Sequence, residues 1–209
     1  IADKQTILVY GDYDVDGTTS AAFLTLFFRA LDVDVHFYIP NREKEGYGLS
    51  TLGIDYAKYI GADVLITCDC GITDFDEVAD ANRKGLDIIV TDHHKPADKL
   101  PEAYAVINPN RYDCSYPFKG LCGAGVAFKL ALAICEKGEI NPEKAWRHSD
   151  VVTLGIAADL VPIQDENRAI VYAGIKQMEK HTNPGITALR KTGGLWGKDI
   201  TVGRLVFWI

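Results

Sequence analysis

The chain has 209 residues, 47% of them hydrophobic, which is enough for one compact domain with a full core, or for one such domain and a small appendage. Its 22 basic and 29 acidic residues give a formal net charge of −7, which argues against a broad basic surface that coats polyanions but not against nucleic acid in one groove. The charged content of 24% excludes a disordered or fibrous chain, and no apolar run approaches the ~18 residues of a membrane span.

Short apolar runs alternate with longer amphipathic ones over the first half of the chain. This alternation predicts a Rossmann-like α/β fold, with a mostly parallel five-stranded sheet flanked by helices. The expected strands are rich in Val, Ile and Leu: Thr6–Tyr10, Asp34–Ile39, Asp63–Cys68, Leu86–Thr91 and Tyr104–Ile107. The expected helices between them are Thr18–Leu31, Ser50–Ile60 and Asp74–Lys84.

The second half of the chain predicts a helical C-terminal segment, which follows a long loop over residues 108–119. The expected helices are Gly123–Lys137, Glu143–Asp159, Asp165–Lys180 and Ile186–Lys191. Residues 199–209 look like the start of an element that is cut off. We therefore expect one domain over residues 1–180, and a segment 181–209 that connects toward a second domain absent from this chain.

Three aspartates at alternate positions, Asp12, Asp14 and Asp16, directly follow the first expected strand. In an extended turn their carboxylates would point the same way and would repel one another unless a cation neutralised them. A calcium loop of the EF-hand type is excluded, because its twelfth position would be Phe23 instead of Glu. The motif therefore predicts a metal site, with an ordinary turn as the alternative.

Asp69 ends the third expected strand and lies between Cys68 and Cys70. This Cys-x-Cys spacing is not that of a zinc knuckle, and no second pair follows, so both cysteines are expected to pack in the core. Five cysteines, an odd number without a disulfide framework, indicate reduced thiols and a cytoplasmic protein. Asp69 itself is the functional candidate, since parallel strands place chemistry at their carboxyl ends.

Asp92, His93 and His94 directly follow the fourth expected strand, and Asp159 lies at the end of an apolar helix. Adjacent histidines on a loop can diverge, so that one binds a metal while the other meets a substrate. Asp159 is costly to bury unless a metal binds it, and the alternative is a residue already in solvent. Together with the earlier aspartates these residues predict an oxygen-rich site with one imidazole, which suits Mn²⁺ or Mg²⁺.

Several motifs in this order resemble the DHH phosphoesterase superfamily over nearly the whole chain. They are GDYDVDGTTS, EGYGLS, TDHH, INPNR and LCGAGVAFKL. The resemblance is closest to the RecJ branch, the single-strand-specific 5′→3′ DNA exonucleases. It implies hydrolysis of single-stranded DNA to mononucleotides in DNA repair and recombination. It also implies DNA as the preferred partner, no membrane, and repair-protein partners bound through regions that this chain lacks.

The resemblance implies two divalent cations, Mn²⁺ or Mg²⁺, and a role for each site residue. Asp14 would bind the first cation and Asp69 would bridge both, while the remaining ligands, Asp16, His93 and Asp159, would bind the second. His94 would face the scissile phosphate, and Asp12 and Asp92 would orient the ligands and basic groups. Many superfamily members have His where this chain has Tyr10, so we expect the first cation to bind more weakly.

Two features are candidates for binding the phosphates of a substrate. Gly123 and Gly125 open an expected helix, whose free backbone N–H groups would suit a phosphate. Arg111 could clamp two phosphate oxygens with its guanidinium fork. A tight helix start and a solvated arginine are the respective alternatives.

Four other functions compete with the nuclease. An enzyme of the same superfamily that acts on short oligoribonucleotides, cyclic dinucleotides or pyrophosphate would keep all the ligands, but Tyr10 and EGYGLS speak against it. A non-catalytic scaffold would have lost ligands that are all present here. A haloacid-dehalogenase-type phosphatase leaves the histidine pair without a role. A dinucleotide-binding domain needs glycines where this chain has Tyr13 and Asp16.

Overall fold

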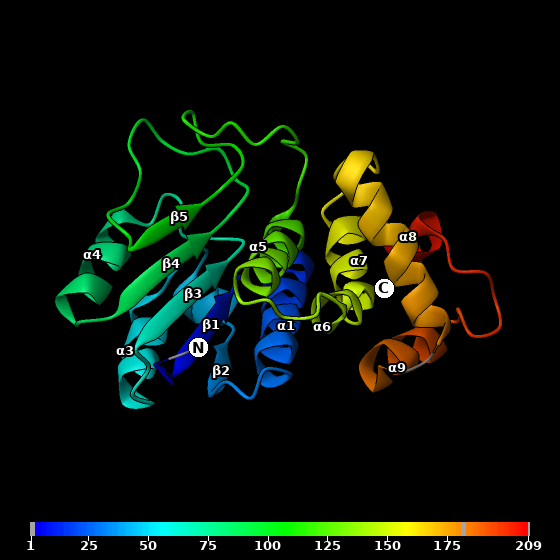
Figure 1. Ribbon diagram of the computed structural model, residues 1–209, viewed down its shortest axis with the longest axis horizontal. Coiled ribbons are helices and arrows are strands. Elements are labelled where there is room, and N and C mark those ends of the chain that lie inside the picture. Colours follow the sequence, from blue (N-terminus) through cyan, green and yellow to red (C-terminus); the bar gives the residue numbers. More distant parts are fainter. Residues whose placement is uncertain (1–2, 181–182, 209) are drawn as a thin grey trace.

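The computed structural model describes residues 3–180 and 183–208, and its first half is built on an all-parallel sheet. The five strands of that sheet are β1 (Ile7–Gly11), β2 (Val35–Tyr38), β3 (Val64–Cys68), β4 (Asp87–Thr91) and β5 (Ala105–Ile107), in the order β2-β1-β3-β4-β5 (Figure 1). The predicted α/β fold is confirmed, and each strand starts one residue after its expected start.

The strand order reverses between β1 and β3, and this position determines where a ligand can bind. β1 pairs with β2 on one side and with β3 on the other, so the chain leaves β1 in one direction and returns to continue in the other. In open parallel sheets the crevice at such a point, beyond the carboxyl ends of the strands, is the usual binding site. Gly11 pairs with Cys68, so the residues that follow β1 and β3 lie side by side.

Helices cover both faces of the sheet (Figure 1). α3 (Thr51–Tyr59) and α4 (Phe75–Arg83) pack on the face that carries Leu8 and Leu65. α1 (Val15–Arg29) and α5 (Gly123–Lys137) pack on the face that carries Val9 and Ile66. Alternate residues of each buried strand thus enter two separate cores, as the two-residue period requires. A short helix that was not predicted, α2 (Arg42–Glu45), lies between β2 and α3.

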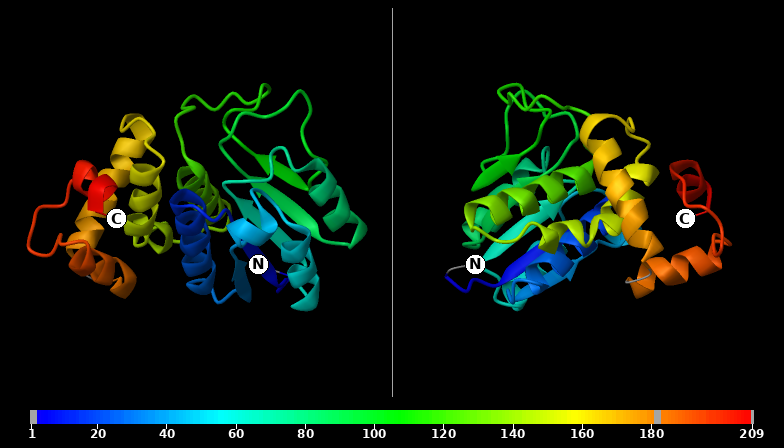
Figure 2. Two further views of the ribbon diagram at one scale, coloured as in Figure 1. Left: turned by 180° about the vertical axis from the view of Figure 1, so that it is seen from behind. Right: turned by 45° about the vertical axis from the view of Figure 1, so that its right-hand side comes forward.

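The remaining helices stack outside α1 and α5, away from the sheet (Figure 2). They are α6 (Glu143–Trp146), α7 (Ser149–Ala158), α8 (Asp165–Glu179), α9 (Pro184–Thr192) and α10 (Val202–Trp208). The single helix expected over Glu143–Asp159 is wrong. The chain turns at His148, because Trp146 packs on Phe128 of α5 at a ring distance of 4.8 Å while α7 runs along α1.

The segment after α8 packs against the rest of the molecule. Its buried side chains Ile186, Leu195, Ile200 and Leu205 belong to the same core as α1 and α5. The element expected to start at Asp199 is α10, and the two residues 181–182 together with Ile209 lie outside the described residues. Within the described ranges no helix has the length and apolar character needed to cross a membrane.

Candidate metal centre

The three aspartates after β1 divide between two clusters, and the expectation that they point the same way is wrong. Asp14 is the N-cap of α1 and accepts a hydrogen bond from the Gly17 N–H at 2.9 Å, so the helix begins inside the motif. Each helical residue turns the chain by about 100°, which rotates Asp16 away from its neighbours. Asp12 and Asp14 gather with Asp69, whereas Asp16 gathers with Asp159 and Cys122, in each case with ligand atoms within 4.8 Å of one another.

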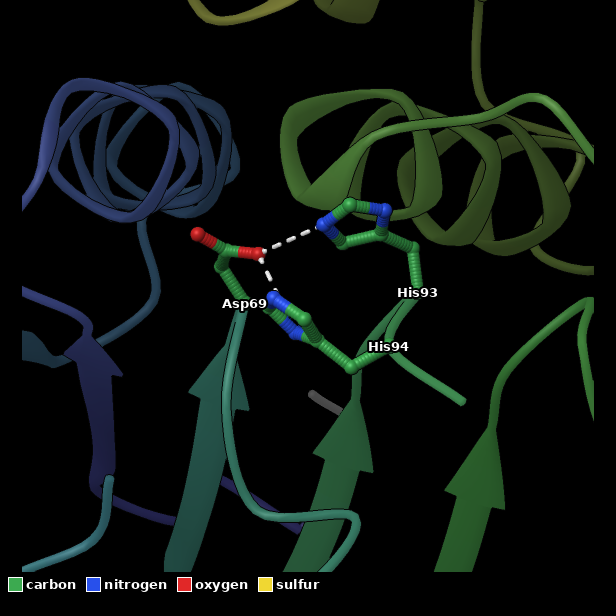
Figure 3. A group of neighbouring side chains, drawn as sticks. All are labelled: Asp69, His93 and His94. Carbon is green, nitrogen blue, oxygen red and sulfur yellow. Dashed lines mark ion pairs between the residues drawn. The ribbon is translucent and has the colours of Figure 1, made fainter. Parts of the chain in front are cut away.

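Asp69 follows the end of β3 and lies beside His93 and His94, which form a third group with it (Figure 3). Its backbone has φ +64°, a left-handed conformation that side-chain-bearing residues rarely adopt, and its N–H donates to the Thr91 carbonyl at 3.0 Å. Its Oδ1 lies 3.1 Å from Nε2 of His93. The same His93 nitrogen is 3.9 Å from Asp16 and 3.8 Å from Asp159. Asp69 therefore contacts candidate ligands of both clusters.

Three atoms of this centre are buried without a hydrogen-bond partner among the described residues: Oδ1 of Asp12, Oδ1 of Asp69 and Nε2 of His93. Such orphaned polar atoms are rare because each one costs free energy. Burial, followed by the charges of Asp16 and Asp14, raises the pKa of Asp69 far above its ordinary value. Burial likewise raises the pKa of Asp16 and of Asp159. Converging carboxylates and an imidazole with free lone pairs fit hard divalent cations.

His94 lies beside His93, with ring centres 4.4 Å apart, and is held by Asp92. The Asp92 carboxylate accepts hydrogen bonds from Nδ1 of His94 at 2.7 Å and from the N–H groups of His93, His94 and Ile72. Burial opposes ionisation of Asp92, but the hydrogen bonds from His94 outweigh it and hold the Asp92 pKa below its usual range. The same bond raises the pKa of His94. The His94 side chain is 45% exposed, so its Nε2 can reach a substrate.

The glycines at the start of α5 do not offer free N–H groups, contrary to expectation. The Gly123 N–H donates to Oδ2 of Asp16 at 2.6 Å, and the Ala124 N–H donates to Oδ1 at 2.9 Å. A Cβ on Gly123 would lie 2.6 Å from Cβ of Asp69, so glycine is needed there for close approach. Gly125 is buried against Leu121. The first two N–H groups of α5 are therefore occupied by the Asp16 carboxylate, which opposes the expected phosphate site.

Gly155 in α7 has a similar role that the sequence pattern did not predict. A Cβ at this position would lie 2.7 Å from Oδ1 of Asp16 and 2.6 Å from Oγ1 of Thr19. The side chain of Asp16 is thus enclosed by glycine on two sides. A glycine inside an apolar helix is the only signal that the sequence offers for such a close approach.

Arg111 is also occupied, which opposes its expected role as a phosphate clamp. Its Nε and Nη2 donate to the two carboxylate oxygens of Asp113 at 2.9 and 2.6 Å, and Nη1 donates to the Val106 carbonyl. The guanidinium fork is therefore already filled by a bidentate carboxylate. A different arginine, Arg42, lies near the site and stacks on an aromatic ring instead of a carboxylate.

An aromatic rim connects Arg42 to His94. The guanidinium of Arg42 lies 5.1 Å from the ring centre of Tyr13, and Tyr13 meets Tyr47 edge to face at 6.4 Å. The Tyr47 hydroxyl lies 3.4 Å from both ring nitrogens of His94. The sequence motifs did not predict Arg42 and Tyr13 as site residues. We define the Arg42–Tyr47 rim as Arg42, Tyr13 and Tyr47.

Tyr10, which stands where many superfamily members have His, points away from the centre. Its hydroxyl donates to the Gly48 carbonyl at 2.8 Å and accepts from the Ser50 N–H at 3.1 Å. These two hydrogen bonds hold the EGYGLS loop in place. The Tyr10 side chain lies in the core on the α3 face of the sheet, so it contributes no ligand.

The five cysteines are free thiols. Cys68 and Cys70 are buried on opposite sides of the sheet, which confirms their expected packing role. The sulfur of Cys122 lies beside Asp16 and Asp159, a position that the sequence pattern does not indicate.

Known proteins match this chain closely. Residues 6–156 match the family model described as the DHH family, N-terminal domain. The single-stranded-DNA-specific exonuclease RecJ of Bacillus subtilis (strain 168) is 41% identical over 194 residues, which are 93% of this chain and 24% of that protein. The exonuclease of the same name from Salmonella typhimurium is 44% identical over 194 residues, with 88% of this chain and 34% of that protein covered.

A solved structure has the same fold. The crystal structure of an exonuclease RecJ bound to manganese aligns with a TM-score of 0.88 and 33% identity, over 100% of this chain and 52% of that chain. This chain spans only about a quarter to a third of the length of the two curated relatives.

Proposed function

The chain belongs to the DHH family and to its RecJ branch, and from this premise we propose that its metal centre hydrolyses the phosphodiester bonds of single-stranded DNA. The observation that carries the proposal is the set of buried, unpartnered ligand atoms on Asp12, Asp69 and His93 at the strand-order reversal, within the described residues. The names of the RecJ relatives support the substrate, and the manganese-bound RecJ structure supports Mn²⁺, with Mg²⁺ as the alternative.

We propose that the ligands divide between two cations, as the two clusters suggest. The first would be held by Asp12, Asp14 and Asp69, and the second by Asp16, Asp69, His93 and Asp159. Asp12 thereby becomes a ligand instead of an orienting residue, because its Oδ1 has no other described partner. The first cation should bind more weakly, since its set lacks an imidazole and Asp14 is exposed. When bound, the cations would lower the pKa of a coordinated water and stabilise charge on the phosphoryl oxygens.

The protein's own contribution to the reaction is orientation and proton donation. Asp92 fixes the His94 ring through Nδ1 and favours its protonated form, so that Nε2 presents an N–H at the open side of the centre. This N–H can donate to a phosphate oxygen or to the leaving oxygen of the displaced nucleotide. Asp16 stays fixed through two backbone N–H groups of α5, so it needs no rearrangement when the site is used.

The Arg42–Tyr47 rim is the part of the surface best suited to guide the strand, and a pair of variants tests this. Arg42→Ala should raise KM for single-stranded DNA by roughly 10–100-fold, because a lost charge-assisted hydrogen bond costs about 1.5–3 kcal/mol. Arg111→Ala is the matched control and should change KM little, since Asp113 already neutralises Arg111. Steady-state kinetics measure KM for both variants. A larger increase in KM for Arg111→Ala than for Arg42→Ala would instead support Arg111 as the phosphate clamp.

We further propose the 5′→3′ direction, mononucleotide products and a preference for DNA, which the resemblance implies. The test is Mn²⁺-dependent digestion of 5′- and 3′-labelled single strands of DNA and RNA, with dinucleotides and duplex DNA alongside. Early release of a labelled mononucleotide from the 5′-labelled DNA strand is expected. Faster turnover of dinucleotides or short oligoribonucleotides would replace this function with that of the small-substrate enzymes.

The RecJ relatives are several times longer than the matched region. We propose that, in a longer protein, the segment 181–209 leads into a further domain that grips the strand, and that repair proteins bind outside the 209 residues of this chain. Support comes from the net charge of −7, which leaves this domain without a broad basic surface.

A further inference from the structure

Cys122 places a thiol inside the otherwise oxygen-rich second cation site. It is the N-cap residue of α5 and is fully buried. Its sulfur lies within 4.8 Å of carboxylate oxygens of both Asp16 and Asp159, and its thiol hydrogen-bonds to Asp16. These two carboxylates are also near Nε2 of His93, at 3.9 and 3.8 Å.

The four groups form a different set of ligands from the one that Mn²⁺ or Mg²⁺ uses. Thiolate sulfur, imidazole nitrogen and carboxylate oxygen all bind Zn²⁺, and thiolate strongly favours soft cations over Mn²⁺ or Mg²⁺. The His93 nitrogen is buried and has no hydrogen-bond partner among the described residues, so it is free to join such a set. The site therefore holds hard and soft ligands around one position.

We propose that Cys122, with Asp16, His93 and Asp159, forms a soft-metal site at which Zn²⁺ displaces the second catalytic cation and inhibits the enzyme. This inference rests on the proposed function, because the inhibited centre is the proposed catalytic one. On binding, the S–H bond of Cys122 breaks, its proton passes to solvent and a sulfur–zinc bond forms. Zn²⁺ binding should therefore release one proton more than Mn²⁺ binding does, namely the proton of the Cys122 thiol.

Cd²⁺ is the spectroscopic probe for this site, because sulfur–cadmium bonds give an ultraviolet charge-transfer band. Titration of the protein with Cd²⁺ should produce this band, and Cys122→Ser should abolish it. Cys114→Ser is the matched control, since Cys114 is the one cysteine that is not buried, and it should keep the band. A band that persists in Cys122→Ser, or none in the original protein, overturns the proposal.

The preference for zinc gives a second measurement. Zn²⁺ is allowed to compete with Mn²⁺ for the protein, and the electron paramagnetic resonance of Mn²⁺ measures how much Mn²⁺ is displaced. The affinity for Zn²⁺ relative to that for Mn²⁺ should fall at least ~10-fold in Cys122→Ser, the scale of a lost contact at a metal site. An unchanged ratio contradicts the role of the thiol.

X-ray absorption of the zinc-loaded original protein needs no variant, and so does not depend on whether Cys122→Ser folds. One sulfur at about 2.3 Å is expected, and a shell of only nitrogen and oxygen overturns the proposal. Failure of the proposed function is distinguishable from failure of this inference. A protein that binds Cd²⁺ through Cys122 but never binds Mn²⁺ or cleaves DNA refutes the function alone, and one that cleaves DNA with Mn²⁺ without the band refutes the inference alone.

Discussion

Replacing Asp69 with Asn should abolish Mn²⁺-dependent hydrolysis of single-stranded DNA and at the same time raise the thermal stability of the metal-free protein. Asp69 contacts both groups of ligands, so its loss weakens both cations. A loss of about 4 kcal/mol of transition-state stabilisation, of the order that a metal ion supplies, reduces the rate about a thousandfold. Activity retained within roughly tenfold, the scale of a lost orienting contact, would contradict the shared-ligand assignment.

The stability gain follows from the electrostatics of the metal-free site. Burial and the charges of Asp16 and Asp14 raise the pKa of Asp69, so above its ordinary value of 3.8 the folded protein must either hold a costly proton or bear the repulsion. Asn carries no charge and tolerates the same left-handed backbone. In chelator the Tm should therefore rise by several degrees, at about 2–4 °C for each kcal/mol. The gain should be small near pH 4 and grow as the pH increases.

A matched variant separates these effects from a generic loss of charge. Asp87 is exposed at the start of β4, at the opposite end of the sheet from the crevice. Asp87→Asn should leave the activity and the Tm in chelator unchanged. If the Tm of Asp69→Asn in chelator is below that of the original protein, the buried charge of Asp69 does not destabilise the metal-free fold.

The sheet was predictable because its signal is local. Buried parallel strands are continuous apolar runs, and each run ended in turn residues, so the strand starts were located to within one residue. Most helix starts were located equally well, but the start of α1 was not. α1 begins at Val15, because the side chain of Asp14 caps it. Asp14 also belongs to the aspartate motif, and the sequence alone does not reveal whether capping or metal binding determines the backbone there. The expected helix start at Thr18 followed from reading the motif as an extended turn.

The sequence indicated which candidate ligands would come together, but it did not indicate their surroundings. Asp69, His93 and Asp159 follow strand or helix ends, so topology brings them together. The enclosing residues come from other parts of the chain. Gly155 packs against Asp16 although the two are 139 positions apart in the sequence. Gly123, whose N–H donates to the same carboxylate, is 107 positions from Asp16. Such contacts depend on the packing of α1, α5 and α7, which has no local pattern. The contact that opposes Arg111 as a phosphate clamp is local instead, because Asp113 lies only two positions along the chain.

His93→Ala and His94→Ala should separate metal binding from catalysis, although the two residues are adjacent. Nε2 of His93 lies within 3.1–3.9 Å of three carboxylates, so its loss should remove the second cation from the binding stoichiometry measured by Mn²⁺ titration. His94 is oriented by Asp92 and opens toward solvent. Its loss should leave both cations in place and lower kcat by roughly 10²–10⁴-fold, the contribution of a positioned proton donor.

The alternative assignment is that His94 is itself a ligand, because its Nδ1 also lies 3.8 Å from Asp69. Under that assignment His94→Ala would lose Mn²⁺ as His93→Ala does, and kcat would recover at high Mn²⁺ concentration. If His94 is the proton donor, added Mn²⁺ rescues neither kcat nor the pH dependence of His94→Ala. His36→Ala, on the exposed edge strand β2, controls for the loss of an imidazole and should behave as the original protein. The hydrogen bond of 2.7 Å to Asp92 favours the proton donor, since an Nδ1 that donates to a carboxylate is not available to a metal.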